Sequence, residues 1–563
     1  MAFQVSPGVQ VKEIDATNVV PAVSTSIGGF TGQFNWGSAS EVVLVGSENE
    51  LAEKFGSPDS VTAKYFLTAA SFLKYGNALK VVRAVASDAR NATVGGTAIL
   101  LKNESDYQAA SLNVSDHGEW VARCPGSLGN AISVDIVTQS ISSSNFNAWQ
   151  HASQFDGIPG TSQKALDLGL TTNDEMHVVV YDKSGAITGT PNTVLETYQF
   201  LSQASDAKNP EGSSIFYKDV INAQSEYIRW AAHSAALPEA GSTLAGVGGG
   251  SFTVSSAVIT DDLTGGVDGA AIGTSEVLAG LDLLADAETI DVNLLFAYPD
   301  ANGSNVIGEK LISVAGARKD CMAFISPPIE DSVNVANPHT SVIVYADSLS
   351  SSSYASLDSG AVYVYDKYND VYRWIGSAGL IAGLCANTDS VADAWFSPAG
   401  VNRGQLLGVT KLAYNPTKAQ RDALYKAKVN PLVSFPGQGT MLFGDKTLLA
   451  RASAFDRINV RRLFITVEKA ISTAAKSQLF EFNDEFTRAQ FRNLLEPFLR
   501  DVKGRRGITD FLVVCDDTNN TSAVVDGNKF VADIYIKPAR SINFITLNFI
   551  ATRTGVSFNE VAG

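Results

Sequence analysis

Residues 455–563 constrain the fold of this chain more than any other segment. Apolar residues first recur at helical spacing in two successive stretches and then alternate in three short runs, with little loop between them. This order predicts two helices followed by three strands. The segment carries none of the side-chain combinations that catalysis requires, so we expect a scaffold that joins to copies of itself. The residues that set the helical period are Val460, Leu463, Phe464, Val467, Ala470, Ile471, Leu494, Leu495, Phe498, Leu499 and Val502.

Strand-like runs stand at both ends of the chain. A lone strand has unpaired edges, so each run must add to a sheet. The alternating apolar residues are Val9, Val11 and Ile14 near the N-terminus and Ile545, Leu547 and Phe549 near the C-terminus.

The length and the pattern of the chain predict several domains. A chain of 563 residues exceeds what one hydrophobic core supports, and about three to four domains follow. Strands alternate with helices in residues 23–96 and again in 271–345, which indicates a sheet layered with helices. Residues 97–270 are rich in Ser, Thr, Gly and Asn around short apolar strands. The predicted fold class is therefore α/β and α+β, multidomain.

We expect four parts along the chain. They are an extended N-terminal arm, 1–22, which joins the core; a middle α/β domain, 23–96 with 271–345; an inserted, mostly-β region, 97–270; and a C-terminal core with a terminal linker strand, 346–563. The expected strands are 42–45 (buried), 79–85, 176–181, 292–297, 321–325, and 361–365 paired with 372–374. The expected helices are 47–55, 60–75, 275–287, 308–317 and 376–386. Ser47 and Glu50 have the spacing of a capping box, and the serine-rich residues 348–353 indicate a linker.

Charge is distributed unevenly. The net charge is −16, yet residues 421–563 hold 20 Lys+Arg against 15 Asp+Glu, which is +5 and leaves −21 for the rest. An acidic body with a mildly basic end suggests that this end faces an acidic partner. Alternatively, five charges over this length reflect chance alone.

Cysteine usage and hydropathy exclude several classes. The four cysteines form no CxxC pair, so we expect buried free thiols in a reducing compartment rather than a zinc site or a redox motif. The N-terminus lacks the features of a signal peptide. No run of about 18 apolar residues predicts a membrane span. The cysteines are Cys124, Cys321, Cys385 and Cys515.

The sequence offers one weak candidate for nucleotide binding. Residues Gly439–Thr447 resemble a P-loop, but Asp445 separates the second glycine from Lys446. The lysine must follow that glycine to reach the phosphates, and Asp445 adds a negative charge where phosphate would lie. We interpret the segment as a glycine turn and expect no enzyme. Lys446 and Thr447 are the residues on which a nucleotide-driven motor would depend.

Other titratable residues indicate structure rather than chemistry, and no cofactor or metal is expected. Asp516–Asn520 and Asp526–Asn528 lack the central glycine and terminal glutamate of a calcium loop, so turn chemistry explains them better. Lys503–Gly507 is a basic cluster after a helix. Either the helix C-terminus favours these cations, or they contact an acidic protein partner. We expect solvated surface positions for the histidines, because none neighbours a nucleophile elbow; they are His117, His151, His177, His233 and His339.

Several motifs resemble the contractile phage tail sheath family, especially that of T-even-type phages. The resemblance is strongest near the C-terminus and poor in residues 97–270. The motifs are Ser6–Asp15, Tyr75–Asn77 followed by Val81–Arg83, Thr264–Gly269, Pro398–Gly400, Asn402–Arg403 and Phe455–Gly555.

The resemblance implies a structural subunit that polymerises as stacked hexameric rings around a tail tube and contracts to drive the tube through the host envelope for genome ejection. It implies a core built from both chain ends, with residues 97–270 outermost. The arm and the last strand would add to sheets of neighbouring subunits. Implied partners are the tail tube, baseplate and tail terminator proteins, without direct nucleic-acid contact or membrane insertion. The implied location is the virion tail, assembled in the host cytoplasm.

The resemblance and the charge pattern also assign residues. The expected intersubunit linkers are Val9, Val11, Ile14, Ile545, Leu547 and Phe549, and the expected tube contacts include Arg488, Arg492, Lys503, Arg505 and Arg506. The alternatives are another self-assembling virion shell protein or an adhesin, since an acidic Ser/Thr-rich β region suits either, and the nucleotide-driven motor.

Overall fold

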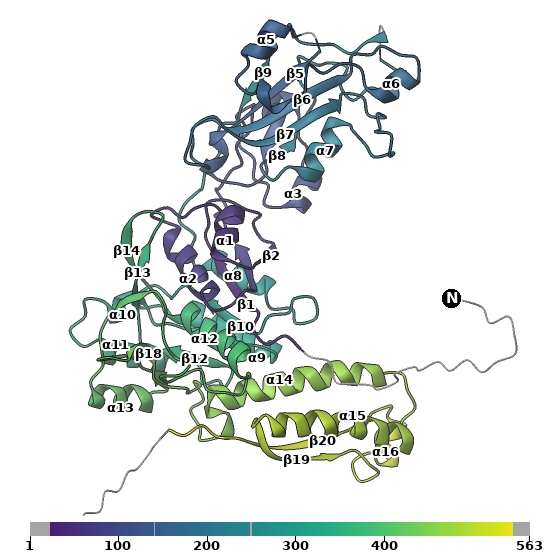
Figure 1. The fold of residues 1–563 in the computed structure, drawn as a ribbon. Coiled ribbons are helices and arrows are strands. Elements are labelled where there is room, and N and C mark those ends of the chain that lie inside the picture. The colour runs from purple at the N-terminus through teal and green to yellow at the C-terminus, as the bar shows by residue number, and fades with distance from the viewer. Residues whose placement is uncertain (1–22, 140, 248–249, 544–563) are drawn as a thin grey trace, which may run out of the picture. The chain divides into compact units, whose positions relative to one another are not determined.

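The computed structural model describes residues 23–139, 141–247 and 250–543, which divide into two compact units (Figure 1). Within those limits, the C-terminal unit contains Val23, Asp393–Ser397 and residues 457–543, and the body contains residues 24–392 and 398–456. The C-terminal unit therefore includes the two helices and the first two strands that the sequence predicts after residue 455.

A seven-stranded sheet forms the centre of the body. Its strands run in the order β16-β12-β11-β10-β1-β3-β2. Neighbours pair in parallel, except that β2 pairs antiparallel with β3. Parallel strands need crossover connections, which explains why the sequence alternates strands with helices. The strands are β1 (Gly28–Gly32), β2 (Val42–Val45), β3 (Leu79–Arg83), β10 (Leu294–Ala297), β11 (Met322–Ile325), β12 (Ala355–Asp358) and β16 (Val429–Asn430).

Helices cover both faces of this sheet. A Cβ added at Gly32 of β1 would lie 2.9 Å from Tyr65 of α2, whereas one added at Gly280 of α8 would overlap Thr31, which points to the other face of β1. Helix α12 packs on α2, and α9 packs on α8. The helices of the body outside residues 97–270 are α1 (Glu48–Phe55), α2 (Ala63–Leu73), α8 (Thr274–Leu283), α9 (Val306–Arg318), α10 (Ile329–Ser332), α11 (Pro338–Ser348), α12 (Ala378–Val391) and α13 (Lys418–Lys426).

The sequence pattern does not reveal the central strand β1. Its residues, Gly-Gly-Phe-Thr-Gly, have low strand propensity, yet all of them are buried. A Cβ at Gly28 would lie 2.8 Å from both Leu79 and Phe72, and one at Gly29 would lie 2.8 Å from Val292. Close packing of neighbouring elements therefore outweighs propensity at the middle of the sheet.

Three local predictions need correction. Ser47 caps α1 by accepting from the Glu50 amide (3.2 Å), but Glu50 Oε2 accepts from the Gly46 amide (2.7 Å), so the capping box is incomplete. Residues 348–353 are the short connection from α11 into the buried strand β12 rather than a linker. Strand β2 is an edge strand, and Val45 is its one buried residue.

Two smaller sheets complete the body outside residues 97–270. The expected hairpin is confirmed: Tyr363 pairs with Trp374 and Tyr365 with Tyr372 across the turn. A third strand adds to this hairpin, and a separate hairpin follows. The strands are β13 (Val362–Asp366), β14 (Val371–Ile375) and β15 (Val409–Leu412) in the first sheet, and β17 (Leu432–Phe435) and β18 (Gly439–Leu442) in the second.

Residues 97–270 contain two antiparallel sheets together with short helices. The larger sheet has the order β7-β6-β5-β9, and β4 pairs with β8. The strands are β4 (Trp120–Ala122), β5 (Ile132–Thr138), β6 (Glu175–Asp182), β7 (Thr193–Ser202), β8 (Ile228–Trp230) and β9 (Ile259–Asp262). The helices are α3 (Glu104–Ala109), α4 (Val114–His117), α5 (Ser143–Ala148), α6 (Gln163–Asp167) and α7 (Tyr217–Gln224).

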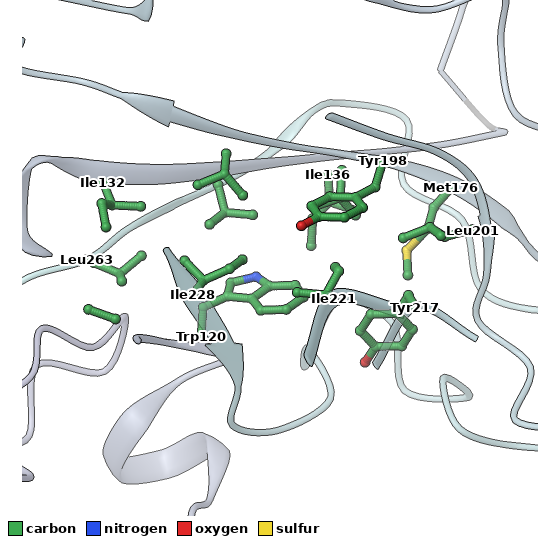
Figure 2. Packing of buried hydrophobic residues seen from close by; sticks show 14 of the residues in the cluster. Trp120, Ile132, Ile136, Met176, Tyr198, Leu201, Tyr217, Ile221, Ile228 and Leu263 are labelled. Carbon is green, nitrogen blue, oxygen red and sulfur yellow. The ribbon is translucent and has the colours of Figure 1, made fainter. Parts of the chain in front are cut away.

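This region is built around a hydrophobic core that also includes Trp36 and Ala92 from the body. Figure 2 shows the Trp120 indole inside the cluster, with Ile228 and Ile221 beside it. Trp120 is 1% exposed, and the side chains of Met176 and Ile132 from the larger sheet belong to the same cluster. The two sheets therefore pack on each other through apolar side chains.

The two chain segments that enter and leave residues 97–270 are held together. Arg90 and Val267 exchange two backbone hydrogen bonds of 2.8 and 3.0 Å, and Thr93 does the same with Thr264. Arg83 is buried and donates to the carbonyl oxygens of Gly37 (2.6 Å) and Pro125 (2.7 Å). Two of the motifs that resemble the sheath family, which contain Arg83 and Thr264, thus form this stem.

The C-terminal unit packs two long helices against a two-stranded sheet. Helices α14 and α15 lie side by side, and β19 and β20 pack along α15 (Figure 1). The two expected helices and the first two expected strands are present, α15 begins earlier than its apolar period indicates, and the third expected strand lies outside the described residues. The elements are α14 (Ile458–Ala475), α15 (Glu485–Gly504), β19 (Ile508–Val514), α16 (Ser522–Asp526) and β20 (Asp533–Pro538).

The fold is mixed α/β with several sheets and more than one compact unit, which confirms the predicted class. The four-part division of the chain stays a prediction. Among the described helices, none combines the length and the hydropathy needed to cross a membrane.

Candidate assembly surface

The core of the C-terminal unit positions its surface side chains. Leu495 and Leu499 of α15 are fully buried, and Leu463 of α14 is 1% exposed. They form one cluster with Val513 of β19 and Trp395. Because one stripe of α15 is buried, the direction of its exposed side chains is fixed.

A turn held by Trp395 ends helix α15. The Gly507 amide donates to the Val502 carbonyl oxygen (2.9 Å). Arg506 has a φ of 67°, in the left-handed region that commonly ends helices. Trp395 Nε1 donates to the Arg505 carbonyl oxygen (3.1 Å), and the Arg505 guanidinium lies 4.9 Å from the indole centroid. The turn is therefore rigidly built, with its basic side chains pointing outward.

The three basic side chains at this end of α15 are exposed. Lys503 Nζ lies 3.3 Å from Asp510 Oδ1, and Arg505 Nη1 lies 2.7 Å from Asp393 Oδ1. The hydrogen bond from Lys503 lowers the pKa of Asp510. Arg506 makes no ion pair within the part of the chain that the structure describes. Exposed pairs contribute little to stability, so an anionic partner can compete for these cations.

Arg488 and Arg492 lie near the start of α15 and face an acidic loop. Arg488 is buried, and its Nη2 lies 2.6 Å from Asp517 Oδ1. Arg492 is half-buried one turn later. A hydrogen bond from Thr518 lowers the pKa of Asp516, and the charges of Arg492 and Arg488 lower it further. These two arginines thus already serve an intramolecular contact.

The structure does not bring the five predicted tube-contact residues into one cluster. Arg488 and Lys503 are separated by about 22 Å along the helix axis at the usual rise per residue. We name Lys503, Arg505 and Arg506 the basic end of α15. The expected linker residues Val9, Val11, Ile14, Ile545, Leu547 and Phe549 lie outside the described residues.

The β19–β20 sheet is incomplete within the described residues. The two strands pair antiparallel from Ile508 with Pro538 to Val514 with Asp533, and neither pairs with a further described strand. One face packs on the core, whereas Leu512 and Tyr535, which are register partners, are exposed on the other. Strand edges of this kind present unpaired N–H and C=O groups to an incoming strand.

The connection between α14 and α15 exposes large apolar side chains. We name Leu479, Phe480, Phe482 and Phe486 the tip. Phe482 is 85% exposed and Phe486 74%, and Phe480 is fully exposed. Sequence reasoning missed this surface because aromatic residues are usually buried. Their position between the two stretches of helical spacing is the sequence feature that could have indicated it.

The residues on which nucleotide binding would depend make structural contacts. Strand β18 supplies Gly439 to Leu442. Lys446 Nζ donates to the Tyr425 carbonyl oxygen (2.7 Å) and lies 4.0 Å from the centroid of that ring. Thr447 is fully buried, and its hydroxyl donates to the Phe455 carbonyl oxygen (2.9 Å). This arrangement does not aim Lys446 and Thr447 at a shared ligand.

The aspartate-rich residues after β19 form a hydrogen-bonded turn. Asp516 Oδ1 accepts from the Thr518 amide (2.9 Å), and Asn519 Oδ1 accepts from the Asp516 amide (3.1 Å). In residues 23–139, 141–247 and 250–543, no group of three or more His, Cys, Asp or Glu is placed to hold a metal ion. The four cysteines are buried.

The histidines of residues 97–270 correct the expectation of solvated positions. His177 Nε2 donates to the Gly157 carbonyl oxygen (2.8 Å), and its Nδ1 accepts from the Phe200 amide (3.1 Å). The ring stacks on Phe155 with centroids 4.3 Å apart. Burial lowers the pKa of His177. The ring is thus a neutral packing group. The fully or nearly buried histidines are His117, His151 and His177.

Three family descriptions match the chain. Residues 25–84 match "Tail sheath protein Gp18 domain III N-terminal region", residues 270–448 match "Phage tail sheath protein central domain", and residues 451–552 match "Phage tail sheath C-terminal domain". The first two ranges lie on either side of the stem.

Curated relatives align along nearly the whole chain. A tail sheath protein of Vibrio phage KVP40 is 34% identical over 99% of both chains. A tail sheath protein of Enterobacteria phage T4 is 33% identical over 99% of both, and one of Salmonella phage ViI is 31% identical over 100% of this chain and 98% of its own. The likeness therefore extends through residues 97–270, where the sequence motifs resemble the family poorly.

Solved structures show the same fold at lower identity. The sheath tail protein of Listeria innocua has a TM-score of 0.55 at 13% identity and covers 92% of this chain and 93% of its own. A sheath complex of an extracellular contractile injection system in the contracted state has a TM-score of 0.51 at 13% identity and covers 98% and 99%.

Proposed function

The chain belongs to the tail sheath family of contractile bacteriophage tails, and we propose that it polymerises as stacked hexameric rings around the tail tube. It is a structural subunit of a contractile sheath and a component of the virion tail. In the proposal, contraction drives the tube through the host envelope for genome ejection. The subunits assemble in the host cytoplasm, with the tail tube, baseplate and tail terminator proteins as partners.

The incomplete β19–β20 sheet is the observation that carries this proposal. Residues 544–563 follow shortly after the end of β20, and residues 1–22 precede Val23, which packs against the core of the same unit. Strand addition supplies main-chain hydrogen bonds without needing particular side chains. We therefore assign the intersubunit linkers to Val9, Val11 and Ile14 in the arm and to Ile545, Leu547 and Phe549 in the last strand.

Truncation tests the linker assignment. Removal of residues 1–20 or 545–563 should leave a folded chain that fails to form tubes in electron microscopy. Val11→Pro should act similarly because it removes a backbone donor. The matched control is Lys12→Ser with Glu13→Ser, which keeps the main chain and should still polymerise. Normal tube yield from either truncated chain would reject the assignment.

We assign the tube contact to the basic end of α15, facing an acidic surface of the tail tube protein. Lys503, Arg505 and Arg506 are exposed there, and their ion pairs are solvent-accessible. Arg488 and Arg492 stay within the proposal, although their contribution requires the Asp516–Asp517 loop to release them.

Charge reversal tests the tube contact. Lys503→Glu with Arg506→Glu should reduce decoration of purified tail tubes and leave the melting temperature unchanged. The control is Arg500→Glu, because Arg500 has a 72% exposed side chain on the same helix but lies outside the basic end. Unchanged decoration by the double variant would reject the assignment.

The proposal includes the four-part division, with the chain ends joined in the innermost core and residues 97–270 outermost. Contraction then uses free energy stored at assembly and no nucleotide, so no residue has a catalytic role. Limited proteolysis of assembled tubes tests the division: cleavage should concentrate in residues 97–270, and early cleavage in residues 457–543 would contradict it.

A further inference from the structure

The tip combines apolar and acidic side chains. Glu481 and Glu485 are exposed beside its phenylalanines, and Asp484 caps α15 by accepting from the Thr487 amide (2.8 Å). Asn483 Nδ2 donates to the Lys529 carbonyl oxygen (2.8 Å). The cap and this long-range hydrogen bond give the tip a defined shape. Exposed apolar groups of this size mark interaction sites.

A second gathering of exposed aromatic side chains lies in the body. One face of the β13–β14 hairpin carries Tyr363, Tyr365, Tyr372 and Trp374, which we name the ladder. The ring centroids of Tyr363 and Trp374 are 4.6 Å apart, and those of Tyr365 and Tyr372 are 5.1 Å apart. Tyr365 and Tyr372 are about half exposed. The ladder is thus a preformed aromatic surface on a rigid sheet.

A cation accompanies the ladder. Lys411 Nζ from β15 lies 4.6 Å from the Tyr363 centroid and 5.3 Å from that of Trp374. Lys411 makes no ion pair with any residue that the structure describes. At the turn of the hairpin, Asp370 accepts a hydrogen bond from the Tyr365 hydroxyl (2.6 Å). The ladder therefore offers aromatic rings and an unneutralised positive charge.

We propose that the tip of one subunit docks on the ladder of a second copy of this chain. The inference rests on the proposed function, because it requires polymerisation. Phenylalanine rings against tyrosine and tryptophan rings give favourable edge and offset contacts, and the carboxylates of Glu481 and Glu485 complement Lys411. The tip and the ladder are different surfaces, so the contact is heterologous, and a heterologous contact that does not close builds a helical filament.

Charge favours a second copy over the tail tube as the occupant of the tip. The proposed function pairs an acidic tube surface with the basic end of α15. The same acidic surface would repel Glu481, Asp484 and Glu485 at the tip. The exposed charges of the tip and of the basic end are thus opposite, since Arg488 near the tip is buried against Asp517.

A cross-linking experiment tests the docking. Two single variants of the full chain, Phe482→Cys and Tyr365→Cys, are mixed under assembly conditions and oxidised. The native cysteines are buried, so the background is low. The inference predicts a disulfide-linked dimer in the mixture and little in either variant alone. The control pair replaces Tyr365→Cys by Val344→Cys, at an exposed apolar residue of α11. No cross-link, or equal cross-linking of the control pair, overturns the inference.

An assembly measurement separates this inference from the proposed function. Phe480→Ser with Phe482→Ser should raise the concentration needed for tube formation by about tenfold or more and leave the melting temperature unchanged; Val391→Ser is the exposed control. Normal tubes from the double variant overturn the inference and leave the proposed function standing. If the double variant forms normal tubes by itself but no longer decorates tail tubes, the tail tube is the occupant of the tip. Wild-type chains that assemble neither alone nor on tail tubes overturn both.

Discussion

The inserted region and the C-terminal unit differ in how far they bury their aromatic side chains. Residues 97–270 bury Trp120 and Phe155 in hydrophobic clusters, and the buried His177 stacks on Phe155. The C-terminal unit leaves Phe480 and Phe482 in solvent and its sheet without further described strands. The inserted region thus shields its aromatic side chains, together with Trp36 of the body, whereas the C-terminal unit leaves large apolar side chains exposed.

Charge follows the same division. Residues 97–270 hold 7 Lys+Arg against 19 Asp+Glu, a net charge of −12. Like charge spread over one region keeps it soluble and discourages contact with copies of itself. The C-terminal unit instead places a basic end and an acidic tip at opposite ends of α15. On the proposed function, self-assembly depends on the C-terminal unit and the ladder and not on the inserted region.

The largest expected effect is in the core of the inserted region. Trp120→Ala removes a side chain that is 1% exposed and should destabilise this region by about 3–5 kcal/mol. Hydrogen exchange followed by mass spectrometry should show lost protection in residues 97–270, with tube formation retained. Loss of tubes at a temperature where residues 457–543 remain protected from exchange would show that assembly also depends on the inserted region.

A matched change in the C-terminal unit should have the converse result. Leu495→Ala removes a fully buried side chain of α15 and should cost about 2–5 kcal/mol. Tube formation should fall with the stability of residues 457–543, while exchange in residues 97–270 stays as in the wild type. Equal loss of protection in both regions would show that they unfold as one unit.

Asp261 gives the inserted region a dependence on pH. Burial raises the pKa of Asp261 to about 7. The folded state therefore holds a proton that the unfolded state releases near its usual pKa, so stability is present at low pH and is lost as pH rises through 7. Asp261→Asn should stabilise the region above pH 7 by up to about 4 kcal/mol, and little near pH 4. Urea unfolding at several pH values measures it, and a pH-independent effect would contradict the assignment.

The buried histidines act in the opposite sense. Burial lowers the pKa of His151 and His177. The unfolded state then binds more protons below the ordinary histidine pKa, so their contribution is present at neutral pH and lost as pH falls. In the Asp261→Asn variant, the pH dependence that remains should be the loss of stability at low pH that these histidines cause.

The smallest expected effect is at the basic end. Arg505→Ala removes partly exposed ion pairs with Asp393 and Asp501 and should change the stability of the C-terminal unit by about 1 kcal/mol or less. Decoration of tail tubes should weaken and depend less on salt. A large fall in melting temperature would show that the cluster serves structure alone.

The sequence predicts the elements whose side chains keep a regular period. Leu463 and Val467 in α14, and Leu495 and Leu499 in α15, follow helical spacing because one stripe of each helix is buried. Strand β1 escapes detection because contact with Phe72 permits only glycine at Gly28.

Surface roles are harder to predict because they depend on what lies nearby in space. The sequence indicates that Arg488 and Lys503 are basic, but their separation follows from the length of α15, and the burial of Arg488 follows from Asp517. Likewise, nothing in the sequence distinguishes the exposed Phe482 from the buried Phe491 except their positions relative to the helical period.

One measurement tests most directly that assembly resides in the C-terminal unit rather than in the inserted region. The hydrogen bonds between Thr93 and Thr264 bring the two stem segments together, so a short glycine-serine link can replace the residues between them. Electron microscopy of this shortened chain should show thinner tubes of stacked rings. A shortened chain that is folded by thermal unfolding yet stays monomeric, where the full chain forms tubes, would contradict the account.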